Sequence, residues 1–210
     1  MTRASDTVAV VLAGGRATRL GGGDKPLRPL AGKPMLSRIL ERLGPQVAKV
    51  AISANGDPAR FAEYGLPVLA DAGEQAGPLS GILSGMAWAK EEGSGHVLTL
   101  AGDTPFFPAD LAGRLAEAVA GRPDHVAAAA SSGRRHPVFA LWPVTLGADL
   151  RDFLIESTTF SVLAFMERHE TVCVDFPMAS IKGNAVDPFF NVNTPDELAQ
   201  AEAMLRGKSL

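Results

Sequence analysis

The segment from Ala13 to Lys25 combines residue types that bind phosphate groups. It holds five glycines and three cations, Arg16, Arg19 and Lys25. Glycine lacks a Cβ, so backbone N–H groups can approach phosphate oxygens, and the cations complement a polyphosphate's charge. The spacing matches neither the P-loop pattern G-x-x-x-x-G-K-[ST] nor the dinucleotide pattern G-x-G-x-x-G. The segment predicts a different nucleotide-binding loop. The alternative is a flexible surface loop without function, but the whole loop is expected to continue to about Lys33, and a loop of roughly 20 residues is uncommon in a compact domain unless it is functional.

Two aspartates follow apolar runs that read as strands. Asp71 comes after residues 66–70, and Asp103 comes after residues 96–101. A carboxylate at the end of a strand can hold Mg²⁺ against the phosphates of a substrate, while the ion keeps several waters. Asp103 could equally cap the turn that follows it, so both interpretations stay open at this point.

Asn191 and Asn193 precede the last predicted helix. Thr194, Pro195 and Glu197 form the pattern of a helix N-terminus with a capping box, which leaves the alternating asparagines unexplained. An Asn carbonyl can ligate a hard cation, and its amide can bind a phosphate or a pterin edge. Turn formation is the alternative.

Two further side chains invite a chemical interpretation. His136 follows Arg134 and Arg135, and this basic group could meet an anionic substrate or simply begin a solvated strand. Ser80 does not occupy the nucleophile position of G-x-S-x-G, so we expect it in the first turn of a helix.

The elements that must position these residues alternate between apolar strands and amphipathic helices. This alternation predicts an α/β fold, a Rossmann-like three-layer sandwich in which helices flank a mostly parallel sheet, as a single domain over residues 1–210. Ligands of such sheets bind beyond the carboxyl ends of the strands, where the polar and glycine-rich segments fall. The predicted strands are 7–12, 47–53, 66–70, 96–101, 126–130, 137–142 and 171–176. The predicted helices are 34–43, 58–64, 79–92, 108–120, 146–154, 159–168 and 195–206, with an irregular stretch at 177–193.

Composition excludes several classes of partner. Twenty basic and 23 acidic side chains leave a net charge of -3, so we expect no nucleic-acid binding. Cys173 is the one cysteine, which excludes an internal disulfide. The chain has no apolar stretch near the ~20 residues of a membrane span and a poor signal-peptide pattern at its start, so we expect a cytoplasmic protein without membrane contact.

In order along the chain, these blocks resemble the molybdenum cofactor guanylyltransferases, a family of the nucleotidyltransferase superfamily that includes sugar-nucleotide pyrophosphorylases. The resemblance covers nearly the whole chain. Its motifs are Leu12-Ala-Gly-Gly15, Arg19, Gly21-Gly22, Asp24-Lys25, Pro34, Asn55, Leu69-Ala-Asp71, Gly77-Pro-Leu with Gly81, Gly102-Asp103-Thr-Pro105, His136-Pro137 and Asn191-Val-Asn193-Thr-Pro195. One departure is Ser53, where some members have Asn, which leaves open how the 53–55 turn contacts a nucleoside.

The resemblance implies a role for each matching residue. Lys25, Asp103 and Arg19 would be catalytic, with Asp103 holding Mg²⁺, and Asn191 and Asn193 would contact the acceptor or a second metal. Asp71 would be the candidate for recognising guanine. The residues implied in GTP binding are Leu12, Ala13, Gly14, Gly15, Lys25, Asn55, Asp71 and Asp103.

The implied reaction transfers GMP from GTP to the terminal phosphate of molybdopterin and releases pyrophosphate. The attacking group is already a phosphate oxygen, so no general base is needed. Transient contact with molybdoenzymes or other cofactor-synthesis proteins is also implied. One alternative is a molybdenum cofactor cytidylyltransferase or a sugar-phosphate nucleotidyltransferase, which Gly14 disfavours because those enzymes often have Ala at this position. The other is a non-catalytic nucleotide-binding module, which the presence of Lys25, Asp71 and Asp103 disfavours.

Overall fold

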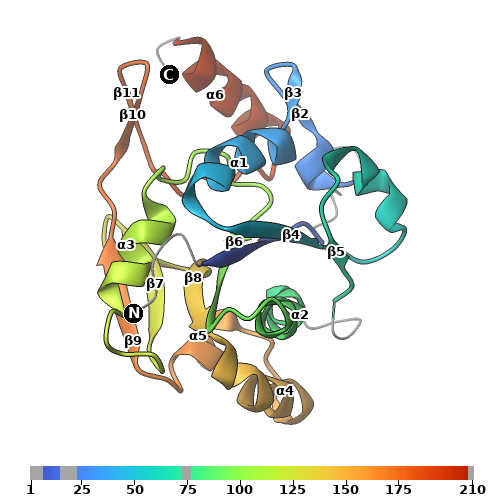
Figure 1. The fold of residues 1–210 in the computed structure, drawn as a ribbon. Helices are drawn as coiled ribbons and strands as arrows, with labels where there is room; N and C mark the ends of the chain where they lie inside the picture. Colours follow the sequence, from blue (N-terminus) through green and yellow to red (C-terminus); the bar gives the residue numbers. More distant parts are fainter. Residues whose placement is uncertain (1–6, 15–22, 72–76, 208–210) are drawn as a thin grey trace.

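The computed structural model describes residues 7–14, 23–71 and 77–207 (Figure 1). Gly15 and Arg19, both predicted to act in the site, lie outside the described residues. Seven strands form one sheet in the order β5-β4-β1-β6-β8-β7-β9. Their bounds are β1 Val8–Leu12, β4 Lys49–Ser53, β5 Val68–Leu69, β6 His96–Ala101, β7 Val126–Ser131, β8 Arg134–Pro143 and β9 Thr171–Asp175.

The predicted mostly parallel sheet is confirmed. β1 pairs in parallel with β4 and β6, β4 with β5, and β7 with β9, whereas β8 runs antiparallel to both of its neighbours, β6 and β7. The central strand β1 has Val8, Ala9, Val10 and Val11 buried. Strands covered on both faces read as continuous apolar runs, which is why the pattern was visible in the sequence.

Helices cover both faces of this sheet (Figure 1). α1 (Met35–Leu43) and α3 (Leu111–Ala118) pack on one face with Ala9 and Val11, and α2 (Pro78–Glu91), α4 (Gly147–Glu156) and α5 (Val162–Met166) pack on the other with Val10. α2 lies close to the sheet, since a Cβ on Gly85 would be 3.1 Å from Val10 Cγ2. The α/β class is therefore confirmed. No helix in the described part of the chain is long and apolar enough to cross a membrane.

A third apolar cluster lies beside the sheet. Here α6 (Pro195–Arg206) contributes Ala201 and Met204, which pack with Leu30 and Met35. This cluster brings α6 next to the hairpin formed by β2 (Pro29–Leu30) and β3 (Lys33–Pro34). It therefore places the residues just before α6 near the segment that begins at Lys25.

The structure corrects several predicted elements. The stretch 177–193 is not wholly irregular, because β10 (Ala179–Ile181) and β11 (Asn184–Val186) form a hairpin. Its turn has positive φ at Lys182 and Gly183, the geometry of a tight two-residue hairpin turn. Residues 58–64 form a 3-10 helix, β8 begins at Arg134 rather than Pro137, and α3 and α5 are shorter than predicted. Further 3-10 turns span Lys25–Leu27, Gly44–Gln46 and Val144–Leu146.

Candidate active site

A cavity of about 400 Å³ opens at the carboxyl ends of the central strands. Its wall includes the last residues of β1, β4 and β6, namely Leu12, Ser53 and Ala101. This is the edge at which ligands of parallel α/β sheets bind. The other lining residues are Gly14, Lys25, Pro26, Asn55, Asp71, Gly77, Pro78, Gly81, Gly102, Asp103, Val138 and Asn191.

One side of the cavity carries a cation, a carboxylate and an amide in direct contact. Lys25 Nζ donates to Asp103 Oδ2 at 2.8 Å and to Asn193 Oδ1 at 2.7 Å. The side chains of Lys25 and Asp103 are 14% and 17% exposed, so the ion pair is largely shielded from water. We call Lys25, Asp103 and Asn193 the phosphate side, because a partly buried Lys with adjacent oxygen ligands suits a metal-bound polyphosphate.

The segment before α6 is held against Asp103 by two more hydrogen bonds. The Val192 N–H donates to the Asp103 carbonyl at 2.9 Å, and Thr104 Oγ1 donates to Asn191 Oδ1 at 2.7 Å. The predicted capping box is present, because Thr194 and Glu197 bond reciprocally at the start of α6. The Asn193 N–H also donates to Glu197 Oε2, at 2.7 Å, so its backbone takes part in the cap. The side chains of Asn191 and Asn193 take no part in it and bond to Thr104 and Lys25 instead, on the side of the cavity that carries Asp103.

The opposite side of the cavity is built around Asp71. Ser53 Oγ donates to Asp71 Oδ1 at 2.6 Å, and Asn55 Nδ2 donates to Asp71 Oδ2 at 2.9 Å. The Asp71 N–H in turn donates a hydrogen bond to Asn55 Oδ1 at 3.1 Å. We call Ser53, Asn55 and Asp71 the nucleoside side. The departure at Ser53 therefore has a structural role, since this hydroxyl orients the carboxylate.

Close approach of the backbone shapes the nucleoside side. A Cβ on Gly81, in the first turns of α2, would lie 2.5 Å from Ser53 Oγ and 2.8 Å from Leu12 Cδ2. Only a residue without a side chain lets α2 approach Ser53 and Leu12 this closely. Ser80, its neighbour, is in the first turn of α2 as predicted and is buried.

Arg60 joins the two sides, and no motif in the sequence indicated it. Its Nη1 donates to the Asp57 carbonyl at 2.7 Å, its Nη2 donates to the Asn55 carbonyl, and its Nε lies 2.9 Å from Asp24 Oδ2. Asp24 directly precedes Lys25, so Arg60 links the turn that carries Asn55 to the start of the phosphate side.

On the phosphate side, the described residues offer one carboxylate, Asp103, to a metal rather than a cage of carboxylates. No group of three or more His, Cys, Asp or Glu side chains gathers for a metal among residues 7–14, 23–71 and 77–207. Mg²⁺ bound to a nucleotide needs only one or two protein carboxylates, because phosphates and waters complete its shell. Asp103, with the amide oxygens of Asn191 and Asn193 nearby, fits that donor set.

Most of the predicted residues are brought together. Leu12, Gly14, Lys25, Asn55, Asp71, Asp103 and Asn191 line the cavity, and Asn193 reaches it through Lys25. Ala13 is fully buried, and its N–H donates to the Ser53 carbonyl at 2.8 Å, so it braces the wall rather than lining it. His136 does not line the cavity and bonds to Ser131 instead.

Comparisons with known proteins identify the family of the chain. Residues 9–172 match the family described as the MobA-like NTP transferase domain. The molybdenum cofactor guanylyltransferase of Mesorhizobium japonicum is 51% identical over 203 residues, which cover 96% of this chain and 97% of the relative. The enzyme of the same name from Rhodopseudomonas palustris strain BisB5 is 47% identical over 93% of this chain and 92% of the relative.

Solved structures support the fold. Molybdopterin-guanine dinucleotide biosynthesis protein A from Archaeoglobus fulgidus superimposes with a TM-score of 0.71 at 22% identity, covering 95% of this chain and 98% of that chain. A CMP:2-keto-3-deoxy-manno-octonic acid synthetase complexed with CTP gives a TM-score of 0.72 at 15% identity, covering 96% and 99%. With a nucleotidyltransferase fold, a cavity at the strand ends and relatives of this similarity, the chain belongs to the molybdenum cofactor guanylyltransferase family and is a nucleotidyltransferase.

Proposed function

We propose that this enzyme transfers GMP from Mg²⁺-bound GTP to the terminal phosphate of molybdopterin, forming the guanine dinucleotide cofactor and releasing pyrophosphate. The observation that carries the proposal is the contact of Lys25 with Asp103 and Asn193 on one side of a cavity whose other side presents Asp71. One side suits a triphosphate, and the other suits a base rich in N–H groups.

The nucleoside side supports guanine as the base. Each oxygen of Asp71 accepts one hydrogen bond, from Ser53 or Asn55, and a carboxylate oxygen has a further lone pair. The remaining lone pairs can accept from N1–H and N2–H₂ of guanine, which cytosine does not present in that arrangement. Leu12, Gly14 and Gly15 would contact the nucleotide through their backbone, although Gly15 is not among the residues that the structure describes.

The phosphate side supports catalysis by positioning and charge neutralisation. An acceptor phosphate oxygen attacks the α-phosphorus of GTP, and the bond to the β-phosphate bridging oxygen breaks, so pyrophosphate leaves and no base is required. Lys25 would stabilise the negative charge of the transferring group, as cationic donors do in phosphoryl transfer. Asp103 would hold Mg²⁺, which supplies further charge neutralisation when bound. Arg19 is proposed as a second cation.

The acceptor would bind beside Asn191 and Asn193. Asn191 lines the cavity and accepts a hydrogen bond from Thr104, the residue that follows Asp103. An acceptor phosphate at this wall would therefore lie near the metal. An amide can donate to a phosphate or to a pterin edge. We also propose a cytoplasmic location, where GTP is available, and transient contact with molybdoenzymes or other cofactor-synthesis proteins.

A pyrophosphate-release assay tests the proposal. The purified enzyme with Mg²⁺ and molybdopterin should release pyrophosphate with GTP and far less with CTP, and omission of molybdopterin or chelation of Mg²⁺ should stop release. Preferential release with CTP would favour a cytidylyltransferase. Absence of release with either nucleotide would contradict the proposed activity and favour a nucleotide-binding module.

A further inference from the structure

Three side chains that the proposed reaction does not use form a hydrogen-bonded chain near the cavity. Ser131 is the last residue of β7 and is only 1% exposed, and its hydroxyl has two hydrogen-bond partners. Ser131 Oγ lies 2.7 Å from His136 Nε2, on β8, and donates to Asp187 Oδ1 at 2.9 Å. We call Ser131, His136 and Asp187 the anchor.

The protons in the anchor can be assigned from the chemistry of its members. A carboxylate only accepts, so the single hydroxyl proton of Ser131 goes to Asp187. The hydroxyl oxygen then accepts, so His136 must carry its proton on Nε2 and donate it to Ser131. Burial lowers the pKa of His136, with Asp187 acting in the opposite direction, which favours the neutral ring with one donor nitrogen.

This arrangement differs from a hydrolytic triad. In a Ser-His-Asp triad the carboxylate holds the imidazole and leaves the serine exposed to substrate. Here Asp187 accepts a hydrogen bond from the serine hydroxyl rather than from the imidazole, and the serine is buried. The anchor is therefore suited to holding structure in place, not to nucleophilic attack.

What the anchor holds is the chain segment that enters the active site. Asp187 Oδ1 also accepts from the Phe189 N–H at 2.9 Å, and the Phe189 ring stacks on His136 with centroids 4.3 Å apart. The hairpin β10–β11 just before Asp187 is not part of the seven-stranded sheet. The anchor therefore ties the returning chain to β7 and β8 before it reaches Asp103.

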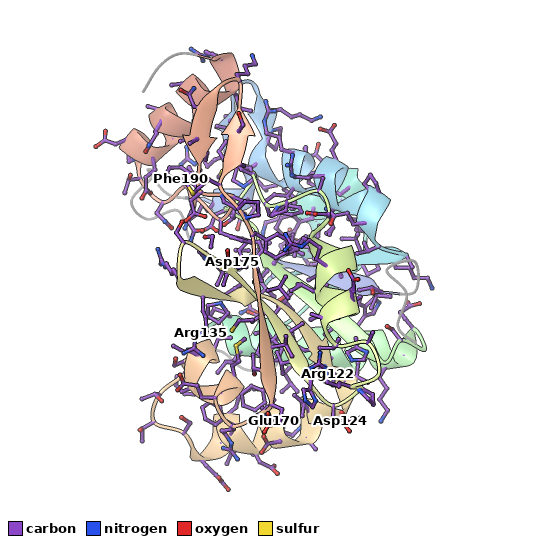
Figure 2. The ribbon with its side chains drawn as sticks, turned by 90° about the vertical axis from the view of Figure 1, so that its left-hand side faces the viewer. Arg122, Asp124, Arg135, Glu170, Asp175 and Phe190 are labelled. Carbon is purple, nitrogen blue, oxygen red and sulfur yellow. The ribbon has the colours of Figure 1, made fainter. Side chains whose placement is uncertain are left out.

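The distance along the chain from the anchor to the site is short. Asp187 precedes Asn191 by four residues, a reach of at most about 14 Å when fully extended. Figure 2 shows Asp175, where β9 ends, and Phe190, which lies farther toward the α6 end of the molecule. Fixing Asp187 therefore restricts where Asn191 and Asn193 can lie relative to Asp103 and Lys25.

We propose that Ser131, His136 and Asp187 are positioning residues for nucleotidyl transfer, which set the placement of the 187–193 segment and thereby of Asn191 and Asn193. The role in turnover rests on the proposed function, whereas the structural role of the anchor does not. Loss of the anchor should affect the reacting phosphates more than GTP binding, because Asp71 and its partners lie on the opposite side of the cavity.

Ser131→Ala tests the proposal in the full-length enzyme. We expect kcat to fall roughly ten- to a hundredfold, since small misplacements near reacting atoms have effects of this size, while the KM for GTP stays within about twofold. Amide hydrogen exchange at Phe189 and Val192 should become faster, and Ser131→Thr, which keeps the hydroxyl, should restore both readouts. Ser157→Ala, which removes a serine hydroxyl bonded to Thr159 near α4, is the matched control and should change neither.

The outcomes separate the anchor from the reaction. Wild-type kcat in Ser131→Ala, with or without faster exchange, would overturn the positioning role. An inactive wild-type enzyme would contradict guanylyl transfer, and the exchange comparison would then decide the anchor alone: faster exchange supports it and unchanged exchange overturns it. If Ser131→Ala does not fold, His136→Phe keeps the aromatic stack on Phe189 but removes the donor, and it should show the same pattern with a smaller loss.

Discussion

The two sides of the cavity are assembled in different ways. The contacts of the nucleoside side join residues 16 and 18 positions apart, from Ser53 or Asn55 to Asp71. Those of the phosphate side join residues 78 and 168 positions apart, from Lys25 to Asp103 and to Asn193. One side is thus made by two neighbouring parallel strands, whereas the other requires three distant segments to converge.

The two sides also differ in charge. On the nucleoside side a carboxylate is surrounded by neutral donors, which leaves an acceptor-rich surface. On the phosphate side the carboxylate is paired with a lysine. With the proposed function, this difference predicts that the nucleoside side selects the base and that the phosphate side promotes the transfer. Variants on the two sides should therefore change different kinetic parameters.

The largest effect is expected from Asp103→Ala. Loss of the proposed metal carboxylate should lower turnover by about 10³-fold or more while the fold is retained. Pyrophosphate release measures the activity and thermal unfolding by circular dichroism checks the fold, with Asp152→Ala on the exposed surface of α4 as the control. Turnover within about tenfold of wild type would remove Asp103 from the reaction.

The second-largest effect is expected from Lys25→Ala. Removal of the cation should raise the barrier by about 3 kcal/mol, roughly a hundredfold in kcat, by analogy with loss of one transition-state donor. Lys49→Ala, which removes an exposed ion pair with Glu92, is the matched control and should leave kcat unchanged. A Lys25 variant with full turnover, or one altered only in KM, would break the division between the two sides.

Asp71→Asn should act on selectivity rather than on chemistry. The amide replaces one acceptor with a donor that faces the N–H groups of guanine, so kcat/KM for GTP should fall about ten- to a hundredfold and the preference over CTP should narrow. Steady-state kinetics with both nucleotides measure this. A loss confined to kcat, with the GTP preference intact, would assign Asp71 to the reaction instead.

Ser53→Ala should have the smallest effect. It removes one hydrogen bond to Asp71, worth about 0.5–1.5 kcal/mol, so the KM for GTP should rise several-fold with kcat nearly unchanged. The same Ser157→Ala control applies. If Ser53→Ala lowered kcat more than it raised KM, the orientation of Asp71 would matter for the transfer step, and the two sides would be coupled.

Residues directly after strands could be predicted from the sequence. Asp71, Asp103 and Lys25 follow apolar strands or a glycine-rich segment, and the carboxyl ends of parallel strands meet at one edge. The layered fold was visible because strands buried on both faces are continuously apolar. The β10–β11 hairpin was missed, because its turn depends on a positive φ at Lys182, which that residue type does not indicate.

Contacts between side chains that are far apart in the sequence could not be predicted from the sequence. Arg60 lies in a predicted helix without any motif, and its bonds to Asn55 and Asp57 depend on how that segment folds back. Ser131 and Asp187 are 56 positions apart and meet because the end of β7 lies beside the chain segment that follows β11. Lys25 and Asn193 are 168 positions apart and are brought together where α6 packs beside the β2–β3 hairpin.

The bond between Lys25 and Asn193 has a consequence for the timing of biosynthesis. Translation adds about 5–20 residues each second, so Asn193 is made roughly 8–34 s after Lys25. Ser53, Asn55 and Asp71 are all present within the first 71 residues of the chain. With the roles proposed above, a nascent chain contains its base-selecting residues long before its reaction centre is complete, and guanylyl transfer would await nearly full synthesis.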